Sequence, residues 1–168
     1  PWLGVYDISN GKAVMYCYLG LSAGDLLAGF LSQWWKSRKK VVRLYLWFSL
    51  ATTLFFLIYL HSINISSATY YLLCFLLGAG TGYWAIFVTI AAEQFGTNIR
   101  STAANTIPNF VRGSVNIVVM LFGLLLSMGI NEGLSAVVVG AIFISLALYS
   151  LSQLKETFGK DLDYFELS

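Results

Sequence analysis

The chain has 168 residues, of which 58% are hydrophobic and only 11% are charged, and its formal net charge is +2. A soluble domain carries about a quarter of its residues as charges, so this composition excludes an ordinary soluble globule. The small net charge also argues against a nucleic-acid-binding protein. Several long apolar segments instead predict an all-α polytopic membrane protein.

Five apolar segments are each long enough to cross a bilayer, because a helix rises about 1.5 Å per residue and the hydrocarbon core is about 30 Å thick. The first of them carries Asp25 as its only formal charge and runs directly into the basic sequence KSRKK at 36–40. The five expected transmembrane helices cover residues 13–35, 41–61, 68–92, 102–128 and 134–154.

The remaining segments are more polar. Residues 1–12 are expected to form an extracytoplasmic loop, with a turn at Asn10-Gly11. Residues 13–154 then form the transmembrane bundle, and residues 155–168 form a charged tail. The chain opens without a methionine, so we expect it to be a fragment of a longer protein.

The positions of lysine and arginine predict how the chain crosses the membrane. Of the ten such residues, eight fall on the side of the KSRKK cluster, Lys12 falls on the opposite side, and Arg112 lies within the fourth expected helix. Because cytoplasmic loops collect positive charge, we expect the N-terminus outside and the C-terminus in the cytoplasm. The protein is thus expected to reside in the lipid bilayer of the cell (inner) membrane.

Two charges lie deep within expected helices. Asp25 lies eleven residues from Lys36, and Arg112 lies twelve residues from Arg100, which places both near the middle of the bilayer. A charge at that depth costs about 2.5–3.5 kcal/mol and normally faces protein or a water-filled cavity. The two residues could pair, bind a charged substrate between them or exchange a proton. The alternative is a buried ion pair that only locks helices together.

Other polar residues share a helical face with each of these charges. On the first expected helix the face consists of Tyr18, Ser22, Asp25, Gly29 and Ser32. On the fourth it consists of Asn105, Asn109, Arg112 and Asn116, with Pro108 in the same stretch. A row of amides is poorly placed against lipid, so both faces are expected to line a substrate or proton pathway. Hydrogen bonding between packed helices is the alternative.

Small residues predict where the helices approach each other closely. They are Gly20, Gly24 and Ala28 on the first expected helix and Gly78, Gly80 and Gly82 on the third. Tyr83 and Trp84 follow the second set and could stack on a substrate, although aromatic residues in membrane helices more often belong to the packed interior. Cys17 and Cys74 fall within apolar segments and are expected to be buried free thiols.

Three short motifs follow one another along the chain: GFLSQWWKSRKK at 29–40, EQFGTNIR at 93–100 and KETFGK at 155–160. In this order and spacing they resemble motifs in the C-terminal half of major facilitator superfamily transporters, among sugar porters and metabolite:proton symporters. The family's counterparts are a loop motif of glycine, acid and basic cluster, an acid-six-arginine link, and a P-E-T-x-G segment. The chain departs from them at Gln33 in place of an acid, Lys36 in place of a glycine and Lys155 in place of a proline.

The resemblance implies that the five helices correspond to the eighth to twelfth of that fold, a partial C-terminal six-helix bundle. It implies that two such bundles rock about a midplane site, so the missing N-terminal half of the same transporter would be a partner. It also implies a cytoplasmic gate made of charge pairs, to which Arg38, Glu93 and Arg100 would belong.

These observations predict a secondary active transporter that moves a small polar metabolite, coupled to a proton, by alternating access. Asp25 is the candidate proton or cation site, and Arg112 is the candidate anchor for an anionic group. The alternative is a non-transporting membrane scaffold or signalling protein of the same fold. The sequence has no nucleophile-base set, no metal-ligand spacing and one histidine, so we expect neither an enzyme nor a cofactor.

Overall fold

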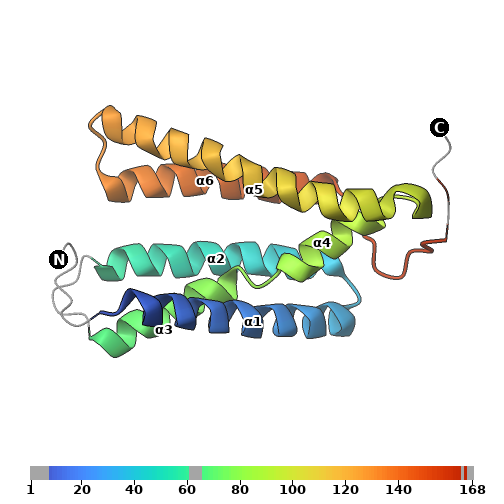
Figure 1. Ribbon diagram of the computed structural model, residues 1–168, viewed down its shortest axis with the longest axis horizontal. Helices are drawn as coiled ribbons and strands as arrows, with labels where there is room; N and C mark the ends of the chain where they lie inside the picture. The colour runs from blue at the N-terminus through green and yellow to red at the C-terminus, as the bar shows by residue number, and fades with distance from the viewer. Residues whose placement is uncertain (1–7, 61–65, 164, 166–168) are drawn as a thin grey trace. The chain divides into compact units, whose positions relative to one another are not determined.

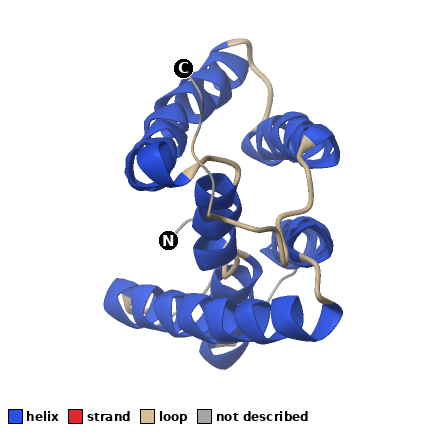
Figure 2. Ribbon diagram, turned by 90° about the vertical axis from the view of Figure 1, so that its right-hand side faces the viewer, coloured by secondary structure: helices blue, strands red, loops and turns tan. Residues whose placement is uncertain are grey.

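The computed structural model describes residues 8–60, 66–163 and 165, and the described chain consists of helices and loops without a strand (Figure 2). Six helices follow one another along it (Figure 1). They are α1 Asn10–Trp35, α2 Arg38–Leu60, α3 Ser67–Gly80, α4 Trp84–Glu93, α5 Thr97–Ser127 and α6 Glu132–Gln153.

Five segments of the described chain are long and apolar enough to cross a membrane, with Ser67–Glu93 counted as one. This confirms the prediction of an all-helical chain with five segments suited to spanning a bilayer. The longest is α5, whose 31 residues extend over about 46 Å at the rise of an α-helix and so exceed the thickness of a hydrocarbon core.

Three helices begin at least three residues earlier than the sequence predicted. α1 begins at Asn10 and not at residue 13, α2 begins at Arg38 and not at 41, and α5 begins at Thr97 and not at 102. Polar residues fit these first turns, because the first four N–H groups of a helix have no partner within it. The predicted turn at Asn10-Gly11 is therefore wrong. The predicted end of the second helix, at residue 61, lies outside the described residues.

The third expected helix, 68–92, is interrupted, which corrects the prediction of one continuous span. α3 ends at Gly80 and α4 begins at Trp84, with a turn at residues 81–83 between them (Figure 1). Gly82 lies so close to α1 that an added Cβ would lie 2.5 Å from the Cα of Gly24. Glycine stabilises a helix less than alanine does, by about 1 kcal/mol. Leaving the helical geometry at Gly82 therefore costs little, and the chain can approach α1 closely there.

The described chain divides into two compact units. The first contains α1, α3 and α2 from Lys40 onward, and it ends at Ala85. The second contains residues 36–39 and the chain from Ile86 onward, including α5 and α6.

The first unit is built on close contact between α1 and α3 (Figure 1). A Cβ on Gly20 would lie 2.0 Å from the carbonyl oxygen of Phe75, and one on Gly78 would lie 1.9 Å from that of Cys17. The backbones thus meet where the sequence predicted close packing by small residues, and that prediction is confirmed. Cys17 and Cys74 are free thiols, as predicted, with Cys74 buried and Cys17 partly exposed.

Two hydroxyl groups of α2 bind backbone oxygens of its neighbours in this unit. The Tyr45 hydroxyl donates to the carbonyl oxygen of Gly24 at 2.7 Å, and the Ser49 hydroxyl donates to that of Gly80 at 2.6 Å. Both acceptors lie next to the helix interruption. The bond from Ser49 gives a partner to the carbonyl oxygen of the last residue of α3, where the helix's own hydrogen bonds end.

In the second unit, α5 and α6 form a hairpin (Figure 1). Gly129 has φ +81 in the connecting turn, which is a conformation that glycine adopts without strain. Asn131 then caps α6, because its side-chain oxygen accepts a hydrogen bond from the N–H of Leu134 at 2.7 Å.

Candidate functional site

The three motif segments meet at one end of the second unit. Residues 36–39 lie before and at the start of α2, residues 93–100 join α4 to α5, and residues 155–162 follow α6. Hydrogen bonds connect the tail segment to both of the others. We call these three segments the motif cluster.

A buried ion pair lies at the centre of the motif cluster. The Arg38 guanidinium donates to the Glu93 carboxylate at 2.6 Å, and the two side chains are 17% and 9% exposed. Arg38 also lies over the ring of Phe158, 5.8 Å from its centroid. Among the described residues, Arg38 Nε and Glu93 Oε2 have no hydrogen-bond partner, so each charge depends strongly on the other.

The carboxylate of Glu156 takes the place of an N-cap for α2. It accepts hydrogen bonds from the backbone N–H of Arg38 at 3.0 Å and of Lys39 at 3.3 Å, and from the hydroxyl of Ser37. The first turn of α2 contains no acidic residue of its own. A negative charge at a helix N-terminus binds the unpaired N–H groups and complements the helix dipole.

The environment of Glu156 holds its side chain in the charged form. Partial burial raises its pKa, but hydrogen bonds from the Ser37 hydroxyl and from the backbone N–H of Phe158, Arg38 and Lys39 outweigh this and leave the pKa below its ordinary value. The cap therefore contributes stability that is fully present above the pKa of the unfolded chain. That stability is lost as the pH falls through the lowered pKa of the folded chain.

We therefore expect thermal stability to fall more steeply with acidification in the wild type than in a Glu156→Gln variant, once the pH is below about 4. At neutral pH the variant should be less stable by about 0.3–1 kcal/mol, the range for an exposed carboxylate at a helix N-terminus. Melting curves of the purified chain in detergent from pH 7 to pH 3 would measure both. Parallel pH profiles for the two proteins would contradict this role of Glu156.

Lys39 makes the reciprocal contact at the end of α6. Its ammonium group donates to the carbonyl oxygen of Ser152 at 3.3 Å and to that of Leu154. These belong to the last turn of α6 and its C-cap. A cation there compensates the partial negative charge of the helix end. The start of α2 and the end of α6 thus each receive a counter-charge from the other segment.

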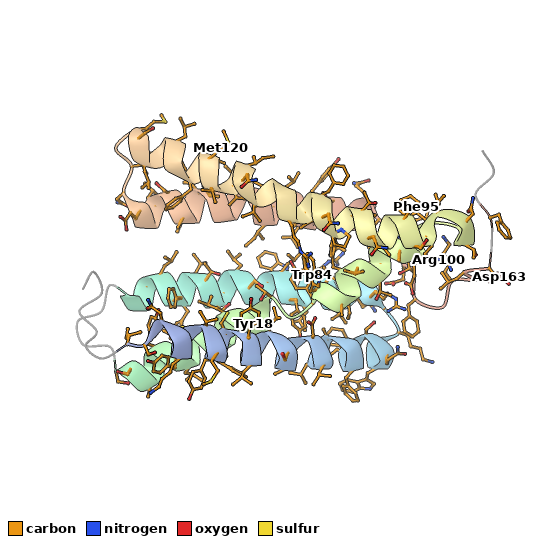
Figure 3. All side chains as sticks on the ribbon, in the orientation of Figure 1. Tyr18, Trp84, Phe95, Arg100, Met120 and Asp163 are labelled. Carbon is orange, nitrogen blue, oxygen red and sulfur yellow. The ribbon has the colours of Figure 1, made fainter. Side chains whose placement is uncertain are left out.

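Arg100 does not join the ion pair with which the sequence grouped it. Its guanidinium donates to the carbonyl oxygens of Phe95, at 3.3 Å, and Leu162. Thr97 donates to the same Leu162 oxygen at 3.1 Å. Figure 3 labels Arg100 and Phe95 near the start of α5. Of the three predicted gate residues, the structure brings together Arg38 and Glu93, while Arg100 fastens the tail.

Sequence reasoning named Glu156 and Ser37 only as letters of their motifs, and it missed the contact between them and the capping of α2. One signal was available, because the first turn of α2 has three basic residues and no acid, so its N–H groups needed an acceptor from elsewhere. Nothing in the sequence identified which acid supplies it. Gly159 was part of the tail motif, and its φ of +73 shows why glycine suits the turn in which Lys160 N–H binds the Thr157 oxygen at 3.1 Å.

In the first unit, Asp25 lies beside the interruption between α3 and α4. Its Oδ1 accepts a hydrogen bond from the backbone N–H of Ala85 at 3.2 Å, in the first turn of α4. The N-terminus of a helix offers unpaired N–H groups and a partial positive charge, so a carboxylate is stabilised there without a cationic side chain. This bond gives the predicted proton site a defined backbone partner.

The remaining polar residues predicted on the first helix divide between two surfaces. Tyr18, labelled in Figure 3, is 65% exposed, and the exposed Ser22 donates to its carbonyl oxygen at 3.0 Å. Ser32 is buried, in line with the glycines that pack against α3. A serine is small enough to fit that packed surface. Ser32 is therefore buried while Tyr18 and Ser22 are exposed, and the predicted polar face is divided.

Tyr83 and Trp84 lie at the interruption itself. Tyr83 is half-buried in the turn, and its ring centroid lies 6.1 Å from that of Tyr45. Trp84 is the first residue of α4 and is also half-buried (Figure 3). Tyr83 thus contributes to the packing around the turn, while stacking of either aromatic side chain on a substrate stays a prediction.

The polar stripe predicted on the fourth span lies on α5, and all its members are exposed: Asn105, Asn109, Arg112 and Asn116. Pro108 is the only buried residue of α5. Next to the stripe, a shallow groove of about 580 Å³ runs along α5 past Asn109, Gly113 and Ile117. Asn109 of the stripe thus lies in an exposed groove that water, substrate or another helix can enter. Asp25 and Arg112 belong to different units, and their common depth stays a prediction.

No protein-family model, no curated protein and no solved structure matches this chain. The functional proposal therefore depends on the three short motifs, on the contacts within the motif cluster, and on the polar residues within the spans.

Proposed function

We propose that this chain is the C-terminal part of a secondary active transporter of the major facilitator superfamily. It moves a small polar metabolite, coupled to a proton, by alternating access. The end that bears the motif cluster faces the cytoplasm, in line with the concentration of lysine and arginine there. The substrate pathway runs past Asp25 and the polar stripe of α5.

The contact between the three motif segments is the observation that carries this proposal. Residues 36–39, 93–100 and 155–162 are far apart in the sequence, and each overlaps a motif that resembles one of the family's. In the structure Arg38 binds Glu93, and Glu156 binds the backbone of residues 38 and 39. A transporter that alternates needs contacts of this kind that hold one side closed and can be broken.

The interrupted span supports the same proposal. Secondary transporters form their substrate and ion sites where a helix is broken near the midplane and its backbone groups become available. Here the interruption at residues 81–83 places the start of α4 beside Asp25, whose carboxylate accepts the Ala85 N–H. Protonation of Asp25 would weaken that bond, so proton binding and the position of α4 would be coupled.

The same hydrogen bond favours the second candidate, a non-transporting membrane scaffold or signalling protein. If Asp25 serves only to cap α4, its charge has a structural use and needs no proton pathway. The two candidates differ in what the charge of Asp25 does beyond accepting a hydrogen bond. Substitutions that keep the acceptor and remove the charge can therefore separate them.

We expect Asp25→Asn to abolish proton-coupled uptake by the full-length protein while its melting temperature stays close to that of the wild type. The amide keeps an oxygen that can accept the Ala85 N–H but cannot carry the proton. Asp25→Ala should lower both uptake and stability, since the N-terminus of α4 then lacks its side-chain acceptor. Arg112→Gln should lower uptake of anionic metabolites.

The measurement is metabolite-driven acidification in proteoliposomes that contain a pH-sensitive dye, with melting curves on the same preparations. A scaffold predicts no metabolite-driven proton movement in any variant, including the wild type. Transport at the wild-type level in both Asp25→Asn and Arg112→Gln would be consistent with a transporter. It would overturn the assignment of these two residues to the pathway.

A further inference from the structure

The first unit contains two thiols that the proposed transport does not use. Cys17 lies on α1 and Cys74 on α3, and both are free cysteines. α1 begins at Asn10 and α3 begins at Ser67, so the two cysteines lie equally far from the starts of their helices. Both helices belong to segments long and apolar enough to cross a membrane. The two thiols therefore lie inside the apolar part of their spans.

α1 and α3 run in the same direction (Figure 1). A Cβ added at Gly20 would lie 2.0 Å from the carbonyl oxygen of Phe75. One turn later on α1, a Cβ added at Gly24 would lie 2.9 Å from the Cα of Gly82. The contacts thus advance along both helices together. One turn before these contacts, the same register brings the two cysteines to one level.

Both cysteines lie on the sides of the helices that face each other. Cys17 precedes Gly20 by three residues and Cys74 precedes Gly78 by four, so each shares a helical face with a glycine of the contact. A Cβ on Gly78 would lie 3.1 Å from the Cα of Cys17 itself. The two thiols are also close enough for a charge on one to act on the other.

The close approach of the two backbones suits a disulfide bond, which requires Cα atoms about 4.4–6.8 Å apart. An added Cβ lies about 1.5 Å from its own Cα, so the Cα atoms of Cys17 and Gly78 are at most about 4.6 Å apart. Cys74 lies one turn from Gly78, on the same side of α3 and level with Cys17. Little movement of the backbone is therefore needed to bring the two sulfur atoms together.

We propose that Cys17 and Cys74 are the site of a reversible oxidative cross-link between α1 and α3, formed with a lipid-soluble hydroperoxide. Cys17 is the more exposed thiol and reacts first. The O–O bond breaks, the Cys17 sulfur becomes a sulfenic acid, and the hydroperoxide leaves as an alcohol. The Cys74 sulfur then attacks the Cys17 sulfur, an S–S bond forms, and water leaves. The two thiols lose two electrons to the hydroperoxide, and a dithiol reductant reverses the reaction.

The cross-link stabilises the contact between α1 and α3. It closes the chain between the two cysteines into a loop, which lowers the entropy of the unfolded chain. It also holds the helices together one turn from the closest approach of their backbones, at Gly20. The first unit is therefore more stable under oxidising conditions, for a transporter and for a scaffold alike.

The test treats the purified chain in detergent with cumene hydroperoxide, then denatures it, adds N-ethylmaleimide and measures its mass. The oxidised chain should take up no maleimide and should be lighter than the untreated chain by two hydrogen atoms before alkylation. Dithiothreitol should restore two reactive thiols. After proteolysis, one disulfide-linked pair of peptides should contain residues 17 and 74. The melting temperature of the oxidised chain should be higher by about 5–10 °C.

Cys74→Ser/Leu72→Cys is the matched control. It keeps two thiols but moves one of them about 200° around α3, to a position where the native leucine is 55% exposed. It should form no link within the chain, and neither should Cys17→Ser. If one of these variants loses its helical signal, the other decides the result.

Two reactive thiols in the wild type after treatment would overturn the proposal. So would a link that forms only between two chains, oxidation to sulfinic acid in place of a link, or equal cross-linking in the control. A link within the chain that leaves the melting temperature unchanged would overturn its stabilising effect.

Discussion

Arg38→Gln is expected to lower the free energy of unfolding by about 3 kcal/mol, because it leaves the buried Glu93 carboxylate without its counter-charge. Glu93 is 9% exposed on its side chain and lies 2.6 Å from the guanidinium, and its other oxygen has no partner among the described residues. For a chain of this length the loss corresponds to a fall of about 6–12 °C in melting temperature. Melting curves followed by tryptophan fluorescence in detergent would measure it.

The double variant Arg38→Gln/Glu93→Gln removes both charges and keeps two side chains that can bind each other. It should be more stable than Arg38→Gln alone. The stability change of the double variant minus the sum of the two single changes gives the coupling energy of the pair. Arg43→Gln is the control, because Arg43 is exposed and its substitution should change stability by less than about 0.5 kcal/mol. Additive effects of the two single substitutions would show that the pair has no coupling.

Gly20→Ala is expected to cause a loss of comparable size in the first unit. The added Cβ would lie 2.0 Å from the carbonyl oxygen of Phe75, and backbone on both sides leaves no flexible side chain to move away. α1 and α3 must then separate, and the glycine contacts around the interruption separate with them. Overpacking of this kind costs about 1–3 kcal/mol, and backbone against backbone belongs at the upper end.

Gly29→Ala on the same helix is the matched control, because nothing lies within 4 Å of the Cβ that it would add. It should be neutral or slightly stabilising, since alanine stabilises a helix more than glycine does, by about 1 kcal/mol. Thermal denaturation of both variants in the same detergent separates the effect of the α1–α3 backbone contact on stability from the effect of helix propensity. Equal melting temperatures for the two variants would contradict the close approach of α1 and α3.

The spans and the close packing of α1 could be predicted because each depends on local pattern. Length and apolarity identify a membrane helix, and glycine and alanine four residues apart mark a close approach. The interruption of the third span could not be predicted in this way. Gly78, Gly80 and Gly82 each disfavour a helix by about 1 kcal/mol without specifying a break, and the turn lies where Gly82 meets Gly24 on another helix.

The contacts of the motif cluster were predictable only in part. Glu93 and Arg38 were grouped by resemblance, and they do form an ion pair. Arg100 was placed in the same group, but it binds the Leu162 oxygen, which no motif position indicated. The contact between Glu156 and Arg38 was missed because the two residues are 118 positions apart, and residue spacing does not indicate a contact over that separation.

The proposed transport pathway requires that the polar stripe of α5 faces water within the membrane. Asn109→Cys, in a full-length protein whose Cys17 and Cys74 are replaced by serine, tests this with a membrane-impermeant thiol reagent. Val118→Cys is the control, on the opposite, half-buried face of α5. We predict labelling at position 109 from at least one side of the membrane and little at 118. Absence of labelling at 109 from either side would contradict the claim.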